Sequence, residues 1–357
     1  MTKRLRVAVL FGGRSGEHDV SLASAANVLA ALSPDRYTVL PIGIDRAGHW
    51  LAAADAQALL AGRDVGQGQE PSRALAAAAE AAGGPVDVVF PVLHGTYGED
   101  GALQGFLEMA GLAYVGCGVL SSALAMDKVL SKRVFREAGF PVVPEVTFRA
   151  ADWSAASGAE VARVCGFPCF VKPANLGSSV GVSKVHQLGE LEAAVQLAAR
   201  YDTKLVAEWA VPEAREIECA VLGNSRPEAS VPGEIVPSRE FYDYAAKYLD
   251  GTSELIIPAP LDADRTTEIR RLAVSAFAAL DCSGMARVDF LLSRSTGELY
   301  LNEVNTIPGF TSISMYAKLW QASGLPYTQL IDRLIELALA RHQERARLST
   351  TFEPPSR

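Results

Sequence analysis

Short apolar runs alternate with amphipathic stretches along the first 118 residues. Three runs are almost wholly apolar, as expected for parallel strands buried on both faces: 5–11, 37–44 and 86–92. Between them, residues 21–32 have apolar positions at helical spacing, and the Ala-rich residues 51–84 are helical in part. This alternation predicts a doubly wound α/β domain over residues 1–118.

The pattern changes after this domain. A helix is predicted over residues 126–139, ending at Gly139, and a second over 188–199. Further strands are predicted at 167–173, 180–185 and 204–209. We expect residues 119–208 to form a central domain that combines helices and strands.

A third domain is expected over residues 209–345. Its predicted elements are strands at 216–222, 234–236, 286–292 and 299–305 and a long helix at 327–345. Residues 346–357 are mostly polar and contain proline, which predicts a disordered tail. Three domains suit a chain of 357 residues, which is long for a single core.

Composition excludes several classes of protein. The chain is 49% hydrophobic and 21% charged, which is ordinary for a globular protein, and its net charge of −8 with no basic tract argues against nucleic-acid binding. No apolar run approaches the roughly 20 residues of a membrane span, so no membrane partner is expected. The basic start leads through a short apolar segment into Gly12-Gly13, so we interpret it as a first strand and not a signal peptide.

The cysteines and most histidines carry no ligand pattern. The five cysteines are scattered; Cys165 and Cys169, four apart in an apolar context, are expected to be buried thiols because no partner pair has metal-ligand spacing, and a reducing, cytoplasmic location is expected. Four of the five histidines are expected at the surface: His18, His49, His186 and His342.

The ends of the two strands at 286–292 and 299–305 carry polar residues in pairs two apart. Arg287 and Asp289 share one face of the first strand, and Glu303 and Asn305 share one face of the second. Carboxylate and amide oxygens suit Mg²⁺, and the Arg suits phosphate. Each residue alone could be a polar position on an edge strand, but the set of four favours a metal–phosphate centre.

Two Gly-containing loops are candidates for ligand binding. The loop at 172–181 offers Lys172, Ser178 and Ser179 beside glycines that let backbone N–H groups turn toward a phosphate, although it is not a Walker A motif. A plain hairpin turn is an equally good interpretation. The loop at 11–17 lacks the G-x-G-x-x-G spacing, which disfavours a dinucleotide.

Three further positions have both a structural and a functional interpretation. Glu17 could be a favourable partner of a helix N-terminus or could receive a substrate ammonium group. His94 follows a buried strand at the edge where α/β proteins bind ligands, or it could be satisfied within its own loop. Residues 240–248 contain four aromatics between charged residues; a packed surface loop and a lid over a site both fit.

Taken together, these segments closely resemble the D-alanine–D-alanine ligase family of the ATP-grasp superfamily. The resemblance extends from Val7 to about Leu339 and rests on several motifs in the same order: 12–22, 93–101, 126–128, 171–181, 241–248, 286–290 and 302–312. It implies a three-domain ATP-grasp fold in which two α+β domains clamp ATP and the N-terminal domain binds the first D-alanine.

The resemblance also implies a role for individual residues. Residues expected at the nucleotide are Lys128, Lys172, Ser179, Glu208, Trp209, Ala210, Glu216 and Lys247. The segment 207–209 differs from the usual pair of acids, so the group that meets the adenine is not fixed. Asp289, Glu303 and Asn305 are the implied ligands of two Mg²⁺ ions, for which Mn²⁺ could substitute.

The substrate side of the implied site is assigned in the same way. Glu17 would orient the ammonium of the first D-alanine and connect through Ser178 to Tyr248. Arg287 and the Gly309 N–H would stabilise the oxyanion. The remaining implied substrate contacts are His94, Ser314 and Met315.

The implied reaction is ATP-dependent joining of two D-alanine molecules through a D-alanyl phosphate, for peptidoglycan precursors, by a cytoplasmic homodimer. A ligase that uses D-lactate as acceptor is the nearest alternative, and Tyr248 argues for the dipeptide. A non-catalytic nucleotide-binding regulator is the alternative from another class, but it should lack part of the metal and oxyanion set.

Overall fold

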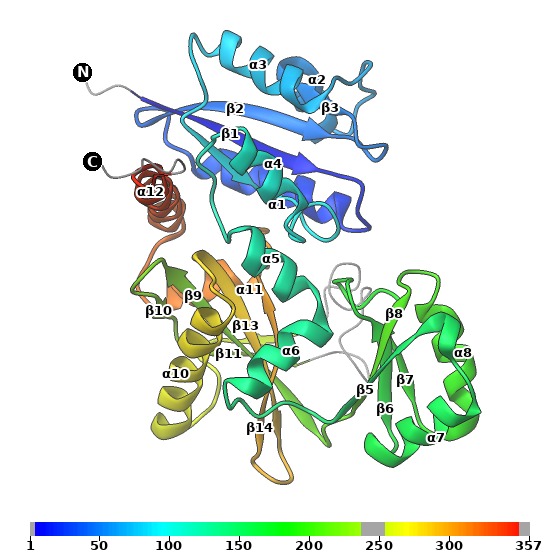
Figure 1. The fold of residues 1–357 in the computed structure, drawn as a ribbon. Helices are drawn as coiled ribbons and strands as arrows, with labels where there is room; N and C mark the ends of the chain where they lie inside the picture. Colours follow the sequence, from blue (N-terminus) through cyan, green and yellow to red (C-terminus); the bar gives the residue numbers. More distant parts are fainter. Residues whose placement is uncertain (1–3, 237–253, 350–357) are drawn as a thin grey trace, which may run out of the picture.

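A computed structural model describes residues 4–236 and 254–349 of the chain, which contain three sheets (Figure 1). The first sheet has the order β3-β2-β1-β4, in which β1 pairs in parallel with β2 and β4. Its strands are β1 (Leu5–Gly12), β2 (Tyr37–Ile44), β3 (Trp50–Ala52) and β4 (Val88–Pro91). Its helices are α1 (His18–Ala31), α2 (Ala53–Leu60), α3 (Pro71–Ala81) and α4 (Ala102–Met109).

Both faces of this sheet are buried. Val7, Val9 and Phe11 of β1 belong to a core with α1 and the C-terminal helix α12 (Tyr327–Ala346). Ala8 and Leu10 point to the other face and belong to a core with α3 and α4. The apolar runs therefore arise from strands covered by helices on both sides, and the predicted doubly wound α/β arrangement is confirmed.

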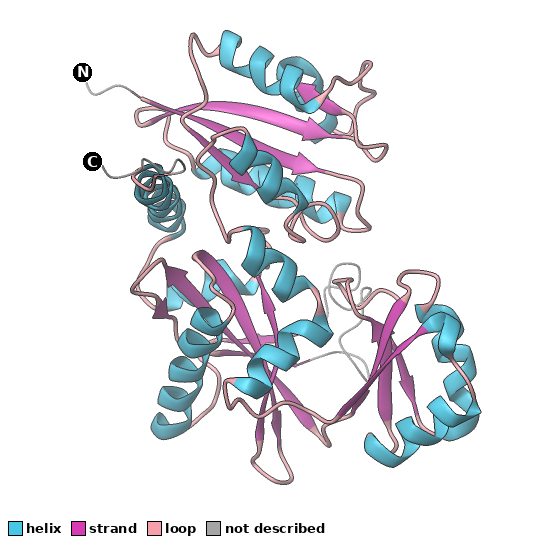
Figure 2. Ribbon diagram, in the orientation of Figure 1, coloured by secondary structure: helices cyan, strands magenta, loops and turns pink. Residues whose placement is uncertain are grey.

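The second sheet is antiparallel, with the order β5-β8-β6-β7. Its strands are β5 (Glu145–Arg149), β6 (Cys169–Pro173), β7 (Ser183–Val185) and β8 (Lys204–Trp209). Helices α7 (Ala155–Val164) and α8 (Leu191–Ala198) pack on one face, as Figure 2 shows. The opposite face is left for the charged side chains of the site.

The third sheet has the order β12-β11-β9-β13-β14, with β10 beside β9. Its strands are β9 (Ala214–Gly223), β10 (Glu228–Ala229), β11 (Gly233–Val236), β12 (Glu254–Ile256), β13 (Gly284–Ser293) and β14 (Leu299–Asn305). Helix α10 (Ala263–Ala279) packs on one face, and α11 (Met315–Ala322) contacts β9 within the core that also contains α12. The strands β13 and β14 are neighbours, so their polar ends lie side by side.

The predicted helix over 126–139 is wrong in its first residues. Asp127 has an extended backbone and separates α5 (Val119–Met126) from α6 (Lys128–Glu137). Its carboxylate accepts hydrogen bonds from the N–H groups of Val129 and Leu130, so it caps α6. The cap fixes the first residue of α6, Lys128, beside the loop that follows β6.

The C-terminal helix α12 is part of the N-terminal core. It contacts α1 and β4, and its Asp332 accepts a hydrogen bond of 2.6 Å from the Tyr37 hydroxyl on β2. Arg341 on the same helix donates to the carbonyl of Tyr114 at 3.0 Å. The first sheet is thus closed by residues more than 200 positions further along the chain.

All five cysteines are buried free thiols, which confirms the prediction for Cys165 and Cys169. The prediction for His18 is wrong: it is buried, with Nδ1 at 2.8 Å from the carbonyl of Gly13. No helix in residues 4–236 or 254–349 is both long and apolar enough to span a bilayer. The predicted lid at 240–248, with Lys247 and Tyr248, and residues 350–357 of the predicted tail lie outside the described residues.

Candidate active site

A cavity of about 390 Å³ lies where the three sheets meet. The first sheet contributes Glu17, His94 and Glu99 from loops at the carboxyl ends of β1 and β4, and the second contributes Ser178. The third sheet and the loop that follows it contribute the remaining predicted residues: Arg287, Glu303, Asn305, Gly309, Ser314 and Met315. Most of the predicted substrate residues therefore line the same cavity.

Asp289, Glu303 and Asn305 lie together at the end of the β13–β14 ladder. Asp289 pairs directly with Glu303, and Arg287 pairs with Asn305. The Asn305 amide donates to Asp289 at 2.9 Å, which leaves its carbonyl oxygen for another partner. Glu303 lies 3.6 Å from the Lys128 ammonium.

This donor set fits a hard divalent cation. Like charges opposed in a ladder repel, so Asp289 and Glu303 need cations between or beside them. Two carboxylates and one amide offer only oxygen, as Mg²⁺ prefers. Within the described part of the chain no three His, Cys, Asp or Glu side chains gather as a metal site, because the third predicted ligand here is an asparagine.

Arg287 is held in one orientation by two carboxylates. Its Nε and Nη2 donate to the two oxygens of Asp289 at 2.8 and 2.7 Å, and its Nε lies 3.0 Å from Glu218. Burial alone would lower the pKa of Arg287, but these two carboxylates raise it above its usual value. The guanidinium is therefore a fixed positive charge facing the cavity.

Glu17 and Ser178 join the first and second sheets. Glu17 is the N-cap of α1 but its side chain caps nothing, and its carboxylate accepts the Ser178 hydroxyl. The loop after β6 joins the antiparallel strands β6 and β7, and within it Ser178 and Ser179 both have positive φ, 52° and 57°. A carboxylate aimed into a cavity favours the ammonium-binding interpretation of Glu17.

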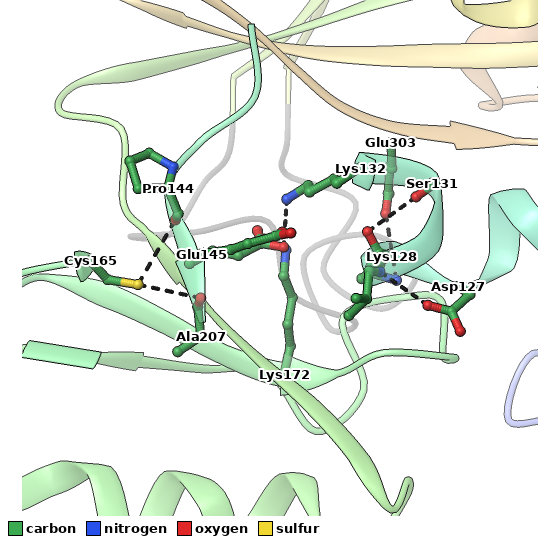
Figure 3. A network of polar contacts seen from close by, with 12 residues as sticks. Asp127, Lys128, Ser131, Lys132, Pro144, Glu145, Cys165, Lys172, Ala207 and Glu303 are labelled. Atoms are coloured by element: carbon green, nitrogen blue, oxygen red, sulfur yellow. Dashed lines mark hydrogen bonds and ion pairs between the residues drawn. The ribbon is translucent and has the colours of Figure 1, made fainter. Parts of the chain in front are cut away.

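The face of the second sheet opposite α7 and α8 carries a row of buried charged side chains. Glu208 on β8 lies 2.6 Å from the Lys172 ammonium on β6 and 2.5 Å from that of Lys132 on α6. Lys132 and Lys172 point toward each other in Figure 3. Burial would raise the pKa of Glu208, but the two ammonium groups lower it to about 2.

The same neighbours act differently on the two lysines. Burial lowers the pKa of Lys132, whereas the pKa of Lys172 is raised because the Glu208 carboxylate outweighs its burial. Lys128 donates to the carbonyl of Leu176 at 2.6 Å, so it reaches the loop that carries Ser178. This face therefore offers cations toward the third sheet, where a polyphosphate would lie.

The remaining predicted nucleotide residues lie at the hinge between the second and third sheets. Trp209 ends β8, and its ring packs edge-on against Tyr300 of β14 with centroids 5.8 Å apart. Ala210 follows and donates to the carbonyl of Pro168 at 3.2 Å. Glu216 lies on β9, opposite Leu291 of β13.

The loop after β14 places Gly309 beside Ser314. A Cβ at Gly309 would lie 2.6 Å from the Ser314 hydroxyl oxygen, so a side chain would displace that hydroxyl. Ser314 is the N-cap of α11 and Met315 its first residue. Free N–H groups at a helix start suit a carboxylate.

The sequence prediction missed three charged groups, of which Lys132 and Glu218 are buried and Glu99 is partly buried. Lys132 could have been found from its position one helical turn after Lys128 in an amphipathic helix. Glu218 lies beside Arg287, two residues after Glu216 on one strand face. Glu99 accepts the Gly95 N–H at 2.9 Å, and burial together with nearby Glu17 raises its pKa to about 8.

Comparison with known proteins agrees with this geometry. A family profile described as D-ala D-ala ligase N-terminus matches residues 6–117, and one described as D-ala D-ala ligase C-terminus matches residues 134–336. The chain belongs to the D-alanine–D-alanine ligase family. The resemblance inferred from the motifs is thus confirmed.

Relatives within the D-alanine–D-alanine ligase family match over almost their whole length. The D-alanine–D-alanine ligase of Thermoanaerobacter sp. (strain X514) is 51% identical, with 97% of this chain and 99% of that protein aligned. The D-alanine–D-alanine ligase of Solibacter usitatus is also 51% identical, with 96% and 98% aligned.

Solved structures support the ATP-grasp ligase fold. The D-alanine-D-alanine ligase from Coxiella burnetii has a TM-score of 0.81 and 39% identity, over 97% of each chain. The VanG D-Ala:D-Ser ligase from Enterococcus faecalis has a TM-score of 0.80 and 37% identity, over 94% of this chain and all of that one. A D-Ala:D-Ser ligase therefore shares this fold.

Proposed function

We propose that this chain joins two D-alanine molecules with ATP, through a D-alanyl phosphate, to make D-alanyl-D-alanine for peptidoglycan, with release of ADP and phosphate. The observation that carries the proposal is one cavity that brings together Glu17, Arg287 and Glu303, with Asp289 directly opposite Glu303 in the β13–β14 ladder. These groups provide for an ammonium, an oxyanion and a metal-bound phosphate. Family membership supports the same reaction.

The nucleotide would lie between the second and third sheets. Lys128, Lys172 and Ser179 would bind its phosphates, the hinge residues 208–210 its adenine, and Glu216 its ribose; Lys247 is predicted to join them from outside the described residues. Asp289, Glu303 and Asn305 would hold two Mg²⁺ ions, or Mn²⁺. Bound there, the ions would neutralise charge on the transferring phosphoryl group.

The chain's own groups would perform the remaining steps. Glu17 orients the first D-alanine so that its carboxylate faces the nucleotide, because the ammonium is held at the opposite end. A carboxylate is a poor acyl donor, so phosphorylation must precede attack by the second D-alanine, whose amine must lose a proton. Arg287 and the Gly309 N–H stabilise the oxyanion, and such a donor is commonly worth about 3–4 kcal/mol.

The second D-alanine would bind beside the loop after β14, where that loop forms part of the cavity wall. Ser314 and the Met315 backbone would bind its carboxylate, and His94 closes the wall beside the first D-alanine. Because an acyl phosphate is labile in water, the predicted lid with Tyr248 would exclude solvent during this step.

The organisation of the protein is proposed on the same basis. We divide it into an N-terminal domain (1–118), a central domain (119–208) and a C-terminal domain (209–345), with a tail at 346–357. We propose a homodimer in the cytoplasm, where ATP and cell-wall precursors are available. Sedimentation of the purified protein tests the dimer.

The activity test is an incubation of the purified protein with ATP, Mg²⁺ and one amino acid or hydroxy acid at a time. ADP release that depends on D-alanine but not L-alanine, with D-alanyl-D-alanine as product, is expected. D-Serine and D-lactate are offered together with D-alanine, because the VanG ligase shares the fold. A mixed product dominated by D-alanyl-D-serine or D-alanyl-D-lactate would reassign the acceptor, and no D-alanine-dependent ADP release would reject the ligase.

A further inference from the structure

The backbone on either side of Gly309 is held mainly by side chains of the N-terminal part, and the Tyr327 hydroxyl of α12 also donates to the carbonyl of Phe310 at 3.3 Å. His94 Nδ1 lies 3.0 Å from the carbonyl of Ile307, and the Phe310 N–H donates to the Ser24 hydroxyl at 3.2 Å. The Asn27 amide donates to the carbonyl of Phe310 at 3.1 Å.

The carbonyl of Ile307 and both backbone polar groups of Phe310 therefore bond to residues of α1 or of the loop after β4. Between the two lies Pro308, which has no N–H, so Gly309 supplies the one N–H of the intervening turn. Gly309 and Ile307 line the cavity, and the side chain of Phe310 is buried in the core. The turn is fixed at both ends and presents one donor to the site.

Ser24 and His94 are linked to each other within this arrangement. The Ser24 hydroxyl oxygen lies 3.2 Å from His94 Nε2. A carbonyl can only accept, so His94 must carry its proton on Nδ1 to bond Ile307. Burial lowers the pKa of His94, which favours the neutral ring.

The direction of every bond in the circuit follows from this tautomer. Nε2 is then an acceptor, so the Ser24 O–H must donate to it, and a Ser24 lone pair remains for the Phe310 N–H. This series of hydrogen bonds runs from the Phe310 N–H through the Ser24 hydroxyl and the His94 ring to the Ile307 carbonyl. It closes around the turn that carries Gly309, and each group has a single role.

We propose that Ser24 and His94 are positioning residues that hold the Gly309 N–H at the oxyanion of the reacting substrate. The inference rests on the proposed ligase function, because only there does an oxyanion form at Gly309. Ser24 is fully buried and does not line the cavity, so it would act only through the turn. An oxyanion donor loses much of its effect when displaced by a fraction of an ångström, because its hydrogen bond must match the transition state.

The variant Ser24→Ala tests this role with little change in volume. It leaves the Phe310 N–H and His94 Nε2 without their shared partner, which lets the turn relax. We expect kcat for D-alanyl-D-alanine to fall at least about 10-fold, with the KM for ATP nearly unchanged.

Ser21→Ala is the matched control. Ser21 lies on the same helix, is equally buried, and bonds the Gly12 N–H and the Val92 carbonyl in place of the Gly309 turn. It should lower the unfolding temperature by a similar amount while leaving kcat within about 2-fold of the wild type. Equal kcat values for Ser24→Ala and Ser21→Ala would overturn the positioning role.

Two readouts do not depend on turnover. Two-bond ¹H–¹⁵N spectra of the five histidines should show His94 as the Nδ1–H tautomer at neutral pH, and an Nε2–H or doubly protonated ring would overturn the circuit. Amide exchange at Phe310 should accelerate in Ser24→Ala and not in Ser21→Ala. A wild-type protein that forms no dipeptide would reject both the proposed function and this inference, whereas an active wild type with an equally active Ser24→Ala would reject the inference alone.

Discussion

Asp289 and Glu303 occupy directly opposed positions in the β13–β14 ladder, so two carboxylates share one end of the sheet. Arg287 and Lys128 lie beside them and offset part of their repulsion. This relationship leads to the first prediction.

Glu303→Gln should lower turnover at least about 100-fold, because one hard anionic ligand is lost while volume is retained. Mg²⁺ and Mn²⁺ should support the wild type, and Zn²⁺ should not, since no thiolate or imidazole is in the predicted set. The measurement is ADP release over a series of metal concentrations. Glu298→Gln, at an exposed position before the same strand, is the control; near-normal activity of Glu303→Gln would remove Glu303 from the metal site.

Arg287→Lys keeps the positive charge between Glu218 and Asp289 but loses the fork that bonds both oxygens of Asp289. We expect kcat to fall at least about 100-fold with a smaller change in the KM for ATP, because the interaction strengthens in the transition state. Steady-state kinetics with ATP and D-alanine varied separately measure both. A sharp rise in the KM for ATP at unchanged kcat would instead make Arg287 a ground-state phosphate ligand.

Glu208 predicts a pH dependence of stability. Its pKa is lowered from about 4.5 to about 2, so in this range the unfolded chain takes up a proton that the folded protein does not. The stabilising contribution is complete above pH 4.5 and disappears as the pH falls through 2. It amounts to at most about 3 kcal/mol.

Glu208→Gln removes this titration and leaves the buried Lys132 without its carboxylate. The free energies of unfolding of wild type and variant, from urea titrations, should differ most at neutral pH and converge between pH 4.5 and 2. Parallel curves over that range would show that Glu208 is not the titrating group. Glu192→Gln, an exposed position on α8, controls for general charge effects.

Tyr248→Phe tests which acceptor the protein uses. This prediction rests on the sequence alone, since the predicted lid is outside the described residues. If its hydroxyl joins the Ser178–Glu17 pair, its loss should cost roughly 1–3 kcal/mol. We expect the variant to use D-lactate measurably, above all at low pH, where little D-alanine amine is neutral. An unchanged ratio of ester to dipeptide across a pH series with both acceptors present would show that Tyr248 does not set the acceptor.

Much of the site could be predicted because it lies on strand ends. The i and i+2 spacing of Glu303 and Asn305 requires only that β14 is a strand, and the pairing of β14 with β13 then brings Asp289 and Arg287 alongside. The same logic gave the three parallel strands of the first sheet from their apolar runs. The spacing of apolar residues, and the burial that it implies, are properties of a single segment, so they can be recognised in the sequence.

What the sequence did not reveal depends on contacts between distant segments. Asp127 interrupts the predicted helix because its carboxylate caps the next one, and Lys204 on β8 pairs with it. His18 has no distinctive sequence context, but folding places it against Gly13 in the core. The Ser24–His94 link to residues 307–310 joins segments over 200 positions apart, which no local pattern encodes.

The position of α12 sets the order in which the chain can mature on the ribosome. The first sheet is synthesised early, yet one face of its core is covered by residues such as Leu330, Leu334 and Ile335 near the other end. Until these residues leave the exit tunnel, Val7, Val9 and Phe11 lack part of their cover and remain an aggregation hazard. The part that is translated first is therefore the last to be completed, and the nascent chain needs protection for nearly its entire synthesis.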